Sequence, residues 1–216
     1  MSCRLSKSIS PSHYLISYGS ISLTPPFEFT GVVSITLRLA NDVDQNSITL
    51  HCLDLAIEQA SLIDGDGGSD GMEATSINYS IKNETVTLVF PSKINSEINS
   101  EKGNVKTLKV VFNGKLNDKM RGLYRSSYVG LDGKEKVMCC TQFESTDARR
   151  AFPCWDEPAF KATFKIIATV PLLPDSNIVA VSNTPVQETN EFRLTGKRFK
   201  TVRICTTRLR LAFIGS

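Results

Sequence analysis

Residues 141–164 read Thr-Gln-Phe-Glu-Ser-Thr-Asp-Ala-Arg-Arg-Ala-Phe-Pro-Cys-Trp-Asp-Glu-Pro-Ala-Phe-Lys-Ala-Thr-Phe. This run contains the only tryptophan of the chain, Trp155, and it places carboxylates and arginines beside an aromatic cluster. Solvated loops are rarely so aromatic, and core strands are rarely so charged. Because buried charges persist only when they are paired and hydrogen-bonded, the run predicts a partly buried polar network around an aromatic plug.

On both sides of this run the chain is patterned as strands. Apolar and polar residues alternate, as in half-buried strands, over residues 33–39, 48–57, 85–90, 108–112 and 164–170. In the second segment the alternation changes phase near Cys52, which predicts a bulge or a sharp twist there. With no long helical periodicity, this succession predicts an all-β fold: an antiparallel β-sandwich, or a saddle of curved sheets, in a single domain over residues 1–216.

Glycine and proline mark the expected ends of these strands. Gly31 and the pair Asn113-Gly114 are typical of turns, and Pro91 and Pro171 are expected to stop strands. Polar stretches at 64–71 and 92–103 are expected to form surface loops. Short helical turns are expected around 146–151, where Asp147 could cap, and around 156–160.

Composition excludes several classes of protein. The hydrophobic fraction of 41% and the charged fraction of 22% are ordinary for a globular chain. A net charge of +3 is too small to indicate nucleic acid or an anionic membrane as a partner. No run approaches the roughly 18 apolar residues of a membrane span, and residues 1–8 lack the apolar region of a secretory signal. We therefore expect a cytoplasmic protein.

The residues that most often carry hydrolytic chemistry are scarce. The six cysteines include no Cys-x-x-Cys pair and are interpreted as free thiols in a reducing compartment. The only histidines, His13 and His51, lie in extended segments without a His-Glu-x-x-His context, so structural roles are favoured over metal ligation. Nothing nearby would lower the pKa of Cys154, which argues against a cysteine nucleophile. The sequence predicts neither a catalytic residue nor a metal ligand.

Gln142 and Glu144 are the remaining candidates. Two residues apart on a strand, their side chains would share one face. A carboxylate and an amide presented together could bind an ammonium group and the neighbouring peptide dipole. The simpler interpretation is a hydrogen-bonded surface pair, and the spacing alone favours it.

A resemblance changes that balance. The run 141–164 closely resembles a signature of the M1 family of zinc aminopeptidases, which includes puromycin-sensitive aminopeptidase. Shorter stretches resemble other motifs of the family in the family's order: 11–15, 27–35, 50–55, 122–128 and 181–186. The resemblance covers roughly residues 10–200, and so many ordered matches are very improbable by chance.

The resemblance implies a saddle-shaped β-sandwich that packs against a thermolysin-like catalytic domain. It implies that Gln142 lines the pocket for the substrate's first side chain and that Glu144 holds the substrate's free amino terminus. A fixed carboxylate there would explain aminopeptidase specificity, because an internal peptide offers no ammonium. It also implies that a set of charged residues props up this loop: Asp147, Arg149, Arg150, Asp156 and Glu157.

The chain departs from the family in what it lacks. The Gly-x-Met-Glu-Asn motif, the His-Glu-x-x-His pair and its downstream glutamate are absent, and residues 201–216 diverge. We therefore expect a substrate-anchoring and docking domain that holds no cofactor of its own and is inactive alone, zinc belonging to the complete enzyme. Its expected partners are a peptide amino terminus and the missing catalytic domain. The alternatives are a stand-alone β-sandwich interaction module and a non-functional truncated product.

Overall fold

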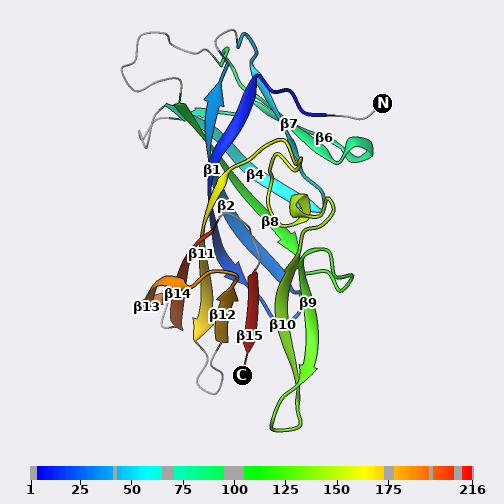
Figure 1. The fold of residues 1–216 in the computed structure, drawn as a ribbon, viewed down its shortest axis with the longest axis vertical. Coiled ribbons are helices and arrows are strands. Elements are labelled where there is room, and N and C mark those ends of the chain that lie inside the picture. Colours follow the sequence, from blue (N-terminus) through cyan, green and yellow to red (C-terminus); the bar gives the residue numbers. More distant parts are fainter. Residues whose placement is uncertain are drawn as a thin grey trace.

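The computed structural model describes residues 4–40, 43–64, 71–94, 105–172, 178–194, 197–206 and 211–215. Within these ranges the chain is built of strands and two short 3-10 turns (Figure 1). The strands of the first half are β1 (Ile9–Ile21), β2 (Glu28–Leu39), β3 (Ser47–His51), β4 (Leu55–Asp64), β5 (Met72–Glu73), β6 (Ser76–Ser80), β7 (Thr85–Val89) and β8 (Val105–Lys115). Those of the second half are β9 (Gly122–Val129), β10 (Glu135–Gln142), β11 (Thr163–Leu172), β12 (Ile178–Ser182), β13 (Val186–Leu194), β14 (Lys197–Thr206) and β15 (Leu211–Gly215). The turns are η1 (Ile81–Asn83) and η2 (Ala148–Arg150), and no helix in these ranges is long and apolar enough to cross a membrane.

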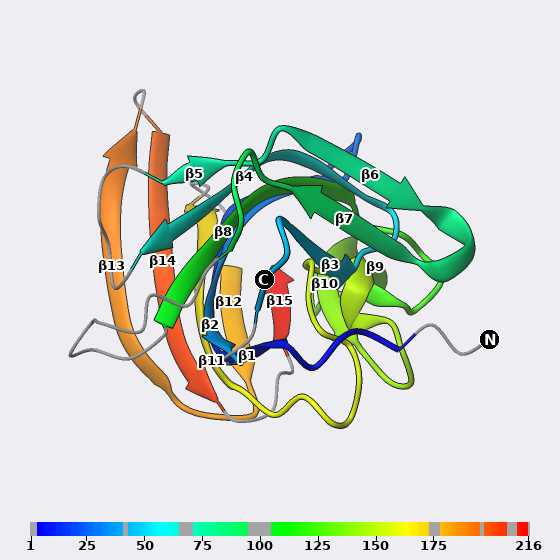
Figure 2. The same cartoon turned by 90° about the horizontal axis from the view of Figure 1, so that it is seen from above.

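The strands form three sheets. The largest has the order β13-β14-β11-β1-β2-β8-β4-β5, a four-stranded sheet has the order β12-β15-β10-β9, and a three-stranded sheet has the order β3-β7-β6. All neighbours pair antiparallel except β1 and β11. Seen from above, the large sheet is strongly curved and bends around β12 and β15 (Figure 2). The all-β, mostly antiparallel fold of curved sheets is therefore confirmed.

Two glycines expected in turns lie inside strands. Gly31 of β2 pairs with Phe112 of β8, and Phe29 of β2 pairs with Gly114 of β8. A Cβ at Gly31 would lie 2.5 Å from the Phe112 ring, and a Cβ at Gly114 would lie 2.6 Å from the Phe29 ring. The turn prediction is wrong because each glycine makes room for an aromatic ring of the paired strand.

The change of phase near Cys52 is a break between sheets. β3 ends at His51 in the three-stranded sheet, and β4 begins at Leu55 in the eight-stranded sheet. Between them Asp54 has a positive φ of 56°. The predicted bulge within one strand is wrong, because the chain leaves one sheet and enters another at this point.

The two prolines behave differently. β7 ends at Val89, just before Pro91, as predicted. β11 continues through Pro171, which pairs with Phe199 of β14. The pairing of β11 with β1 ends at Ala168, so Pro171 lies where the strand has one described partner and its missing N–H interrupts no second ladder. Of the two predicted loops, residues 65–70 and 95–103 lie outside the described residues.

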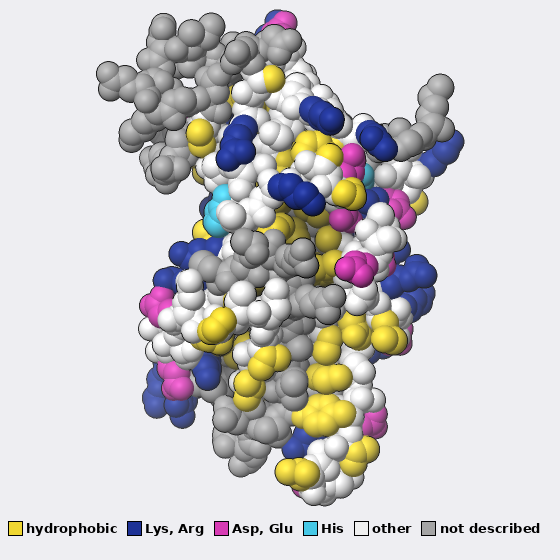
Figure 3. Space-filling model, in the orientation of Figure 1, with side chains coloured by type: hydrophobic (Ala, Val, Ile, Leu, Met, Phe, Trp, Pro, Cys, Tyr) yellow, Lys and Arg dark blue, Asp and Glu magenta, His cyan; other side chains and the backbone are white. Residues whose placement is uncertain are grey.

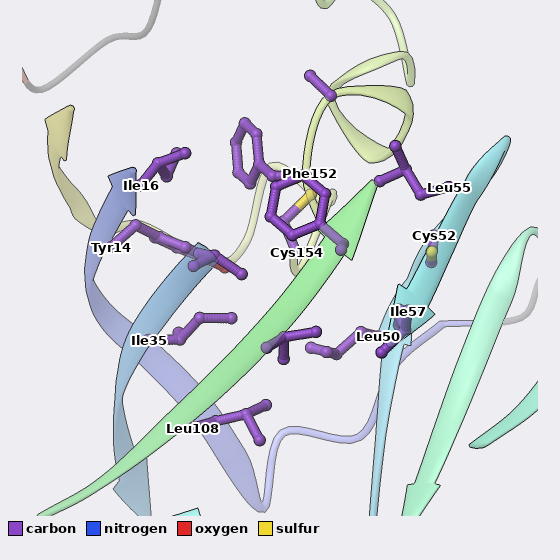
Figure 4. Packing of buried hydrophobic residues seen from close by; sticks show 14 of the residues in the cluster. Tyr14, Ile16, Ile35, Leu50, Cys52, Leu55, Ile57, Leu108, Phe152 and Cys154 are labelled. Atoms are coloured by element: carbon purple, nitrogen blue, oxygen red, sulfur yellow. The ribbon is translucent and has the colours of Figure 1, made fainter. Parts of the chain in front are cut away.

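The core draws side chains from several strands and from the segment that follows η2. Figure 4 shows Tyr14 of β1, Ile35 of β2 and Leu108 of β8 in the same buried cluster as Phe152 and Cys154. All five side chains are buried. The charged run of the sequence is thus anchored to the core through its aromatic part.

Candidate functional site

The run 141–164 folds into consecutive parts with different exposure. Gln142 is the last residue of β10, residues 144–147 form a turn, and η2 follows. Residues 151–155 are buried, and β11 begins at Thr163. One short stretch therefore passes from solvent into the core and back.

Aromatic rings form the base of this region. Trp155 is 5% exposed, and its backbone N–H donates to the Tyr14 hydroxyl at 3.1 Å. The Tyr14 ring stacks on Phe164 at 4.9 Å and meets Phe152 edge-on at 6.0 Å. The predicted burial of Trp155 is confirmed, and the rings fix the segment against β1 and β11.

A buried arginine ties this segment to distant parts of the chain. Arg149 is 6% exposed; its Nε donates to Asp156 Oδ2 at 3.0 Å and its Nη1 donates to Glu84 Oε2 at 2.9 Å. Its carbonyl accepts a hydrogen bond from the Leu53 N–H at 3.0 Å. Burial raises the pKa of Asp156, and the guanidinium of Arg149 opposes that rise. The predicted polar network is present, and its buried charge is paired on both sides.

The neighbouring arginine forms a second, more exposed cluster. Arg150 Nε donates to Asp147 Oδ1 at 2.9 Å, and Arg150 Nη1 pairs with Asp54. Asp147 makes no capping hydrogen bond to η2, so the predicted cap is wrong; its carboxylate is engaged by Arg150 instead. Gly122 opens β9 with a φ of +65°, and a Cβ there would lie 2.6 Å from that of Arg150. Close approach of β9 to η2 therefore requires glycine at this position.

Both histidines have structural surroundings. His51 pairs through its backbone with Cys154, and its Nδ1 accepts a hydrogen bond from the Asp156 N–H at 3.2 Å. Burial, and then the charge of Arg149, lowers the pKa of His51 to about 4. His13 Nδ1 shares a hydrogen bond with the Thr163 hydroxyl at 2.7 Å.

The donors among the described residues do not fit a zinc ion. A catalytic zinc needs about three protein ligands, and no group of three or more His, Cys, Asp or Glu side chains within the described ranges is placed to hold a metal. The four described cysteines are free: Cys52, Cys139, Cys140 and Cys154. Burial raises the pKa of Cys154 well above its ordinary value, which makes it a poor nucleophile.

Gln142 and Glu144 lie together at one cleft, here called the Glu144 cleft, of about 650 Å³. Other side chains that line it include Tyr14, Phe152, Trp155, Asp156, Glu157 and Lys161. Glu144 lies in the turn beyond β10, so the two side chains do not share a strand face as the spacing suggested. The cleft brings them together nonetheless, and Gln142 Nε2 donates to the Glu144 carbonyl at 3.3 Å.

The Glu144 carboxylate differs from its neighbours. Glu144 is exposed, and its side chain makes no hydrogen bond or ion pair with the described residues. Asp147 and Asp156 are both paired with arginine, and Glu157 Oε1 accepts the Leu5 N–H at 2.7 Å. An open carboxylate above an aromatic floor can accept a cationic ligand group.

Sequence reasoning missed two members of the network, Glu84 and Asp54. Both have positive φ, 54° and 56°, and each immediately precedes a strand, β7 or β4, far from residue 149 in the chain. No local pattern marks them, because their role depends on how the three-stranded sheet packs beside η2.

Comparison with known proteins places this architecture in a family. The model of the Peptidase M1 N-terminal domain matches residues 10–208. The chain therefore belongs to this family, the N-terminal domain of M1 aminopeptidases.

Individual relatives agree with this assignment. The chain is 43% identical over 161 residues to "Aminopeptidase M1" of Arabidopsis thaliana, covering 74% of the chain and 17% of the relative. It is 35% identical over 213 residues to "Aminopeptidase 2" of Candida albicans, covering 97% of the chain and 20% of the relative. With "Puromycin-sensitive aminopeptidase" of Caenorhabditis elegans it shares 36% over 192 residues, covering 86% and 18%. The chain thus spans about a fifth of the length of these relatives.

Proposed function

We propose that this chain is the substrate-anchoring and docking domain of a zinc aminopeptidase that removes amino-terminal residues from peptides. The observation that carries the proposal is the Glu144 carboxylate, open to solvent at the mouth of the Glu144 cleft and unpaired among the described residues. The surrounding carboxylates already have partners, so Glu144 is the acceptor left for a ligand.

The chemistry of the anchor is simple. The ammonium of a peptide's first residue donates a charge-assisted hydrogen bond to the Glu144 carboxylate, and an internal peptide bond offers no such donor. Gln142 lies beside it, held by its bond to the Glu144 carbonyl, and contacts the first side chain. Together they select the free end of a peptide and set its register.

Bond cleavage belongs to a partner domain. Within the described part of the chain the donors do not form a metal site, and we expect the chain alone neither to hold zinc nor to hydrolyse peptides. Exposed apolar side chains support docking: Met120 is 66% and Val129 is 72% exposed. Hydrophobic side chains gather in the lower right of Figure 3, where Figure 1 draws β9 and β10. The free cysteines favour the cytoplasm, a reducing compartment.

A domain exchange tests the anchor. This chain would replace the corresponding segment of the Arabidopsis aminopeptidase M1, and hydrolysis of aminoacyl reporter substrates would be measured. Glu144→Ala should lower the specificity constant about ten- to a hundredfold, the loss of a hydrogen bond to a charged group worth roughly 1.5–3 kcal/mol. Gln142→Ala should change the ranking of first side chains.

The matched control is Glu135→Ala, which removes another exposed glutamate, at the far end of β10. It should leave the specificity constant unchanged. If Glu144→Ala, with zinc content and folding intact, stays within about twofold of the unmodified exchange, less than a single hydrogen bond is worth, the anchoring role is wrong.

A further inference from the structure

A second cleft lies on the other side of the Asp156–Pro158 segment. It measures about 550 Å³ and is here called the His51 cleft. His51, Arg149, Arg4, Lys82, Glu84 and Glu157 contribute to its lining, and Asp156, Glu157 and Pro158 line both clefts. The function proposed above makes no use of this space.

The buried residues His51 and Arg149 form the floor of the His51 cleft, and His51 presents a ring N–H donor there. His51 is 4% exposed, and its Nδ1 accepts the Asp156 N–H. A neutral imidazole that accepts at one nitrogen carries its proton on the other, so Nε2 is an N–H donor. No described residue accepts this hydrogen, and His51 lines the cleft.

Arg149 adds further donors at the same floor. Its three hydrogen bonds use Nε and one hydrogen on each terminal nitrogen. A guanidinium has five N–H groups, so one hydrogen on each terminal nitrogen has no acceptor among the described residues. The floor thus presents donors to an oxygen-bearing ligand.

The rim offers both signs of charge. Arg4 and Lys82 are exposed and form no ion pair within the described ranges. Glu157 has one oxygen bonded to the Leu5 N–H, and Glu84 has one oxygen bonded to Arg149. A multiply charged anion would meet these carboxylates, and a simple cation would meet the buried guanidinium of Arg149.

We propose that the His51 cleft binds a small zwitterion, a free α-amino acid, whose carboxylate accepts from His51 Nε2 and faces Arg4 and Lys82 while its ammonium faces Glu157 and Glu84. The terminus of a short peptide shares this chemistry and is distinguished by the test. The proposal does not depend on the role of Glu144.

NMR of the histidine rings in the full chain is the direct test, because the chain has two histidines. Titration with L-alanine should shift the His51 ring signals saturably and leave those of His13 in place. N-acetylalanine, which lacks the ammonium, and alaninamide, which lacks the carboxylate, should both bind at least tenfold more weakly, as loss of a hydrogen bond to a charged group implies. Alanyl-alanine binding more tightly than L-alanine would identify a peptide terminus as the occupant.

Substitutions then locate the contacts, with affinity read from the backbone amide signals of Asn83 and Glu84, which line the His51 cleft and not the Glu144 cleft. His51→Asn keeps an oxygen that can accept the Asp156 N–H but removes the Nε2 donor, and should weaken L-alanine at least tenfold. Lys82→Gln, at a fully surface position, should weaken it about two- to fivefold. Lys119→Gln is the matched surface control and should have no effect.

Glu144→Ala separates the two clefts, because an amino acid could also reach the Glu144 carboxylate through its ammonium. The His51 signals should respond to L-alanine in this variant as in the unmodified chain. The proposal is overturned if the His51 ring signals do not saturate up to the solubility limit of L-alanine. It is equally overturned if the acetylated or amidated compound binds as tightly, or if Lys82→Gln and His51→Asn both leave the affinity unchanged.

Discussion

The turn at residues 144–147 and the segment 149–155 are near neighbours in the chain and opposite in character. In the segment, Arg149 forms ion pairs with Glu84 and Asp156, and the Trp155 side chain is buried. In the turn, the Glu144 carboxylate is exposed and unpaired among the described residues. The difference separates two uses of polar side chains: paired ones hold the backbone in place, and an unpaired one on that rigid base is available to a ligand.

The comparison predicts that the largest losses of stability come from the aromatic base. Trp155→Ala should lower the free energy of unfolding by about 3–5 kcal/mol, the cost of emptying a buried aromatic site. Urea denaturation of the full chain measures this, and the single tryptophan should emit at short wavelength in the native protein.

Phe192→Ala is the control for removal of a ring. Phe192 is 39% exposed and stacks on Phe199 at 5.6 Å in the edge strand β13. Phe192→Ala should lower the free energy of unfolding much less than Trp155→Ala does. A red-shifted native emission, or an unchanged denaturation midpoint for Trp155→Ala, would contradict the burial of this side chain.

The two adjacent arginines offer a second contrast. Arg149→Met leaves Asp156 without its guanidinium and should cost about 2–4 kcal/mol, less than the full penalty for a buried pair because Glu84 reaches solvent. Arg150→Met removes pairs with Asp147 and the more exposed Asp54 and should cost about 1 kcal/mol.

Thermal and urea unfolding of both variants measure the difference. Equal losses at positions 149 and 150 would show that burial of the first arginine does not set its contribution. A larger loss at position 150 would reverse the assignment of the two clusters.

The pattern of the chain predicted the fold class and the strands well, because alternation along a strand is local. Val33–Leu39 and Thr85–Val89 lie within strands as expected. The predictions of turns at Gly31 and Gly114 and of a bulge near Cys52 were wrong. A glycine that faces a ring and a passage of the chain between two sheets both depend on residues far away in the chain. Glycine occurs both in turns and where a neighbouring side chain packs closely on a strand, so its presence in a sequence does not distinguish the two.

The candidate site divides in the same way. Gln142 and Glu144 could be named from their run, and the cleft does contain both. The reason given from spacing was wrong, since Glu144 lies in a turn. Glu84 and Asp54 could not be found, because each meets its arginine from a part of the chain far away in sequence. The sequence identified the run that contains the candidate site residues, and only the fold shows which of its charged side chains are unpaired among the described residues.

The buried His51 should make stability depend on pH. Its pKa is lowered from the ordinary 6.5 to about 4. Between these two values His51 is protonated in the unfolded chain and stays neutral in the folded chain. Stability therefore falls as pH drops from 6.5 towards 4, by about 2–3 kcal/mol from this group, since each pKa unit is worth about 1.4 kcal/mol.

Asp156 acts in the opposite direction, because its pKa is raised in the fold. The contribution of His51 is therefore read as a difference between variants. Urea unfolding of the unmodified chain and of His51→Asn should be compared between pH 7 and pH 4. The difference in the free energy of unfolding between the two proteins should become smaller as pH falls. A difference independent of pH would show that His51 titrates normally in the fold.

The smallest expected effect tests the comparison most directly. Glu144→Ala and Gln142→Ala should each change the free energy of unfolding by less than about 0.5 kcal/mol, as is usual for surface positions away from buried partners. The physical reason is that the Glu144 carboxylate contributes no bond to the described fold, and the bond that Gln142 makes to the Glu144 carbonyl is long and exposed. Asp156→Asn, on the same cleft, is the matched substitution: it weakens the Arg149 pair and should cost clearly more. If Glu144→Ala destabilised the chain as much as Asp156→Asn, the Glu144 carboxylate would be part of the scaffold, and its availability to a peptide amino terminus could not be inferred from its exposure.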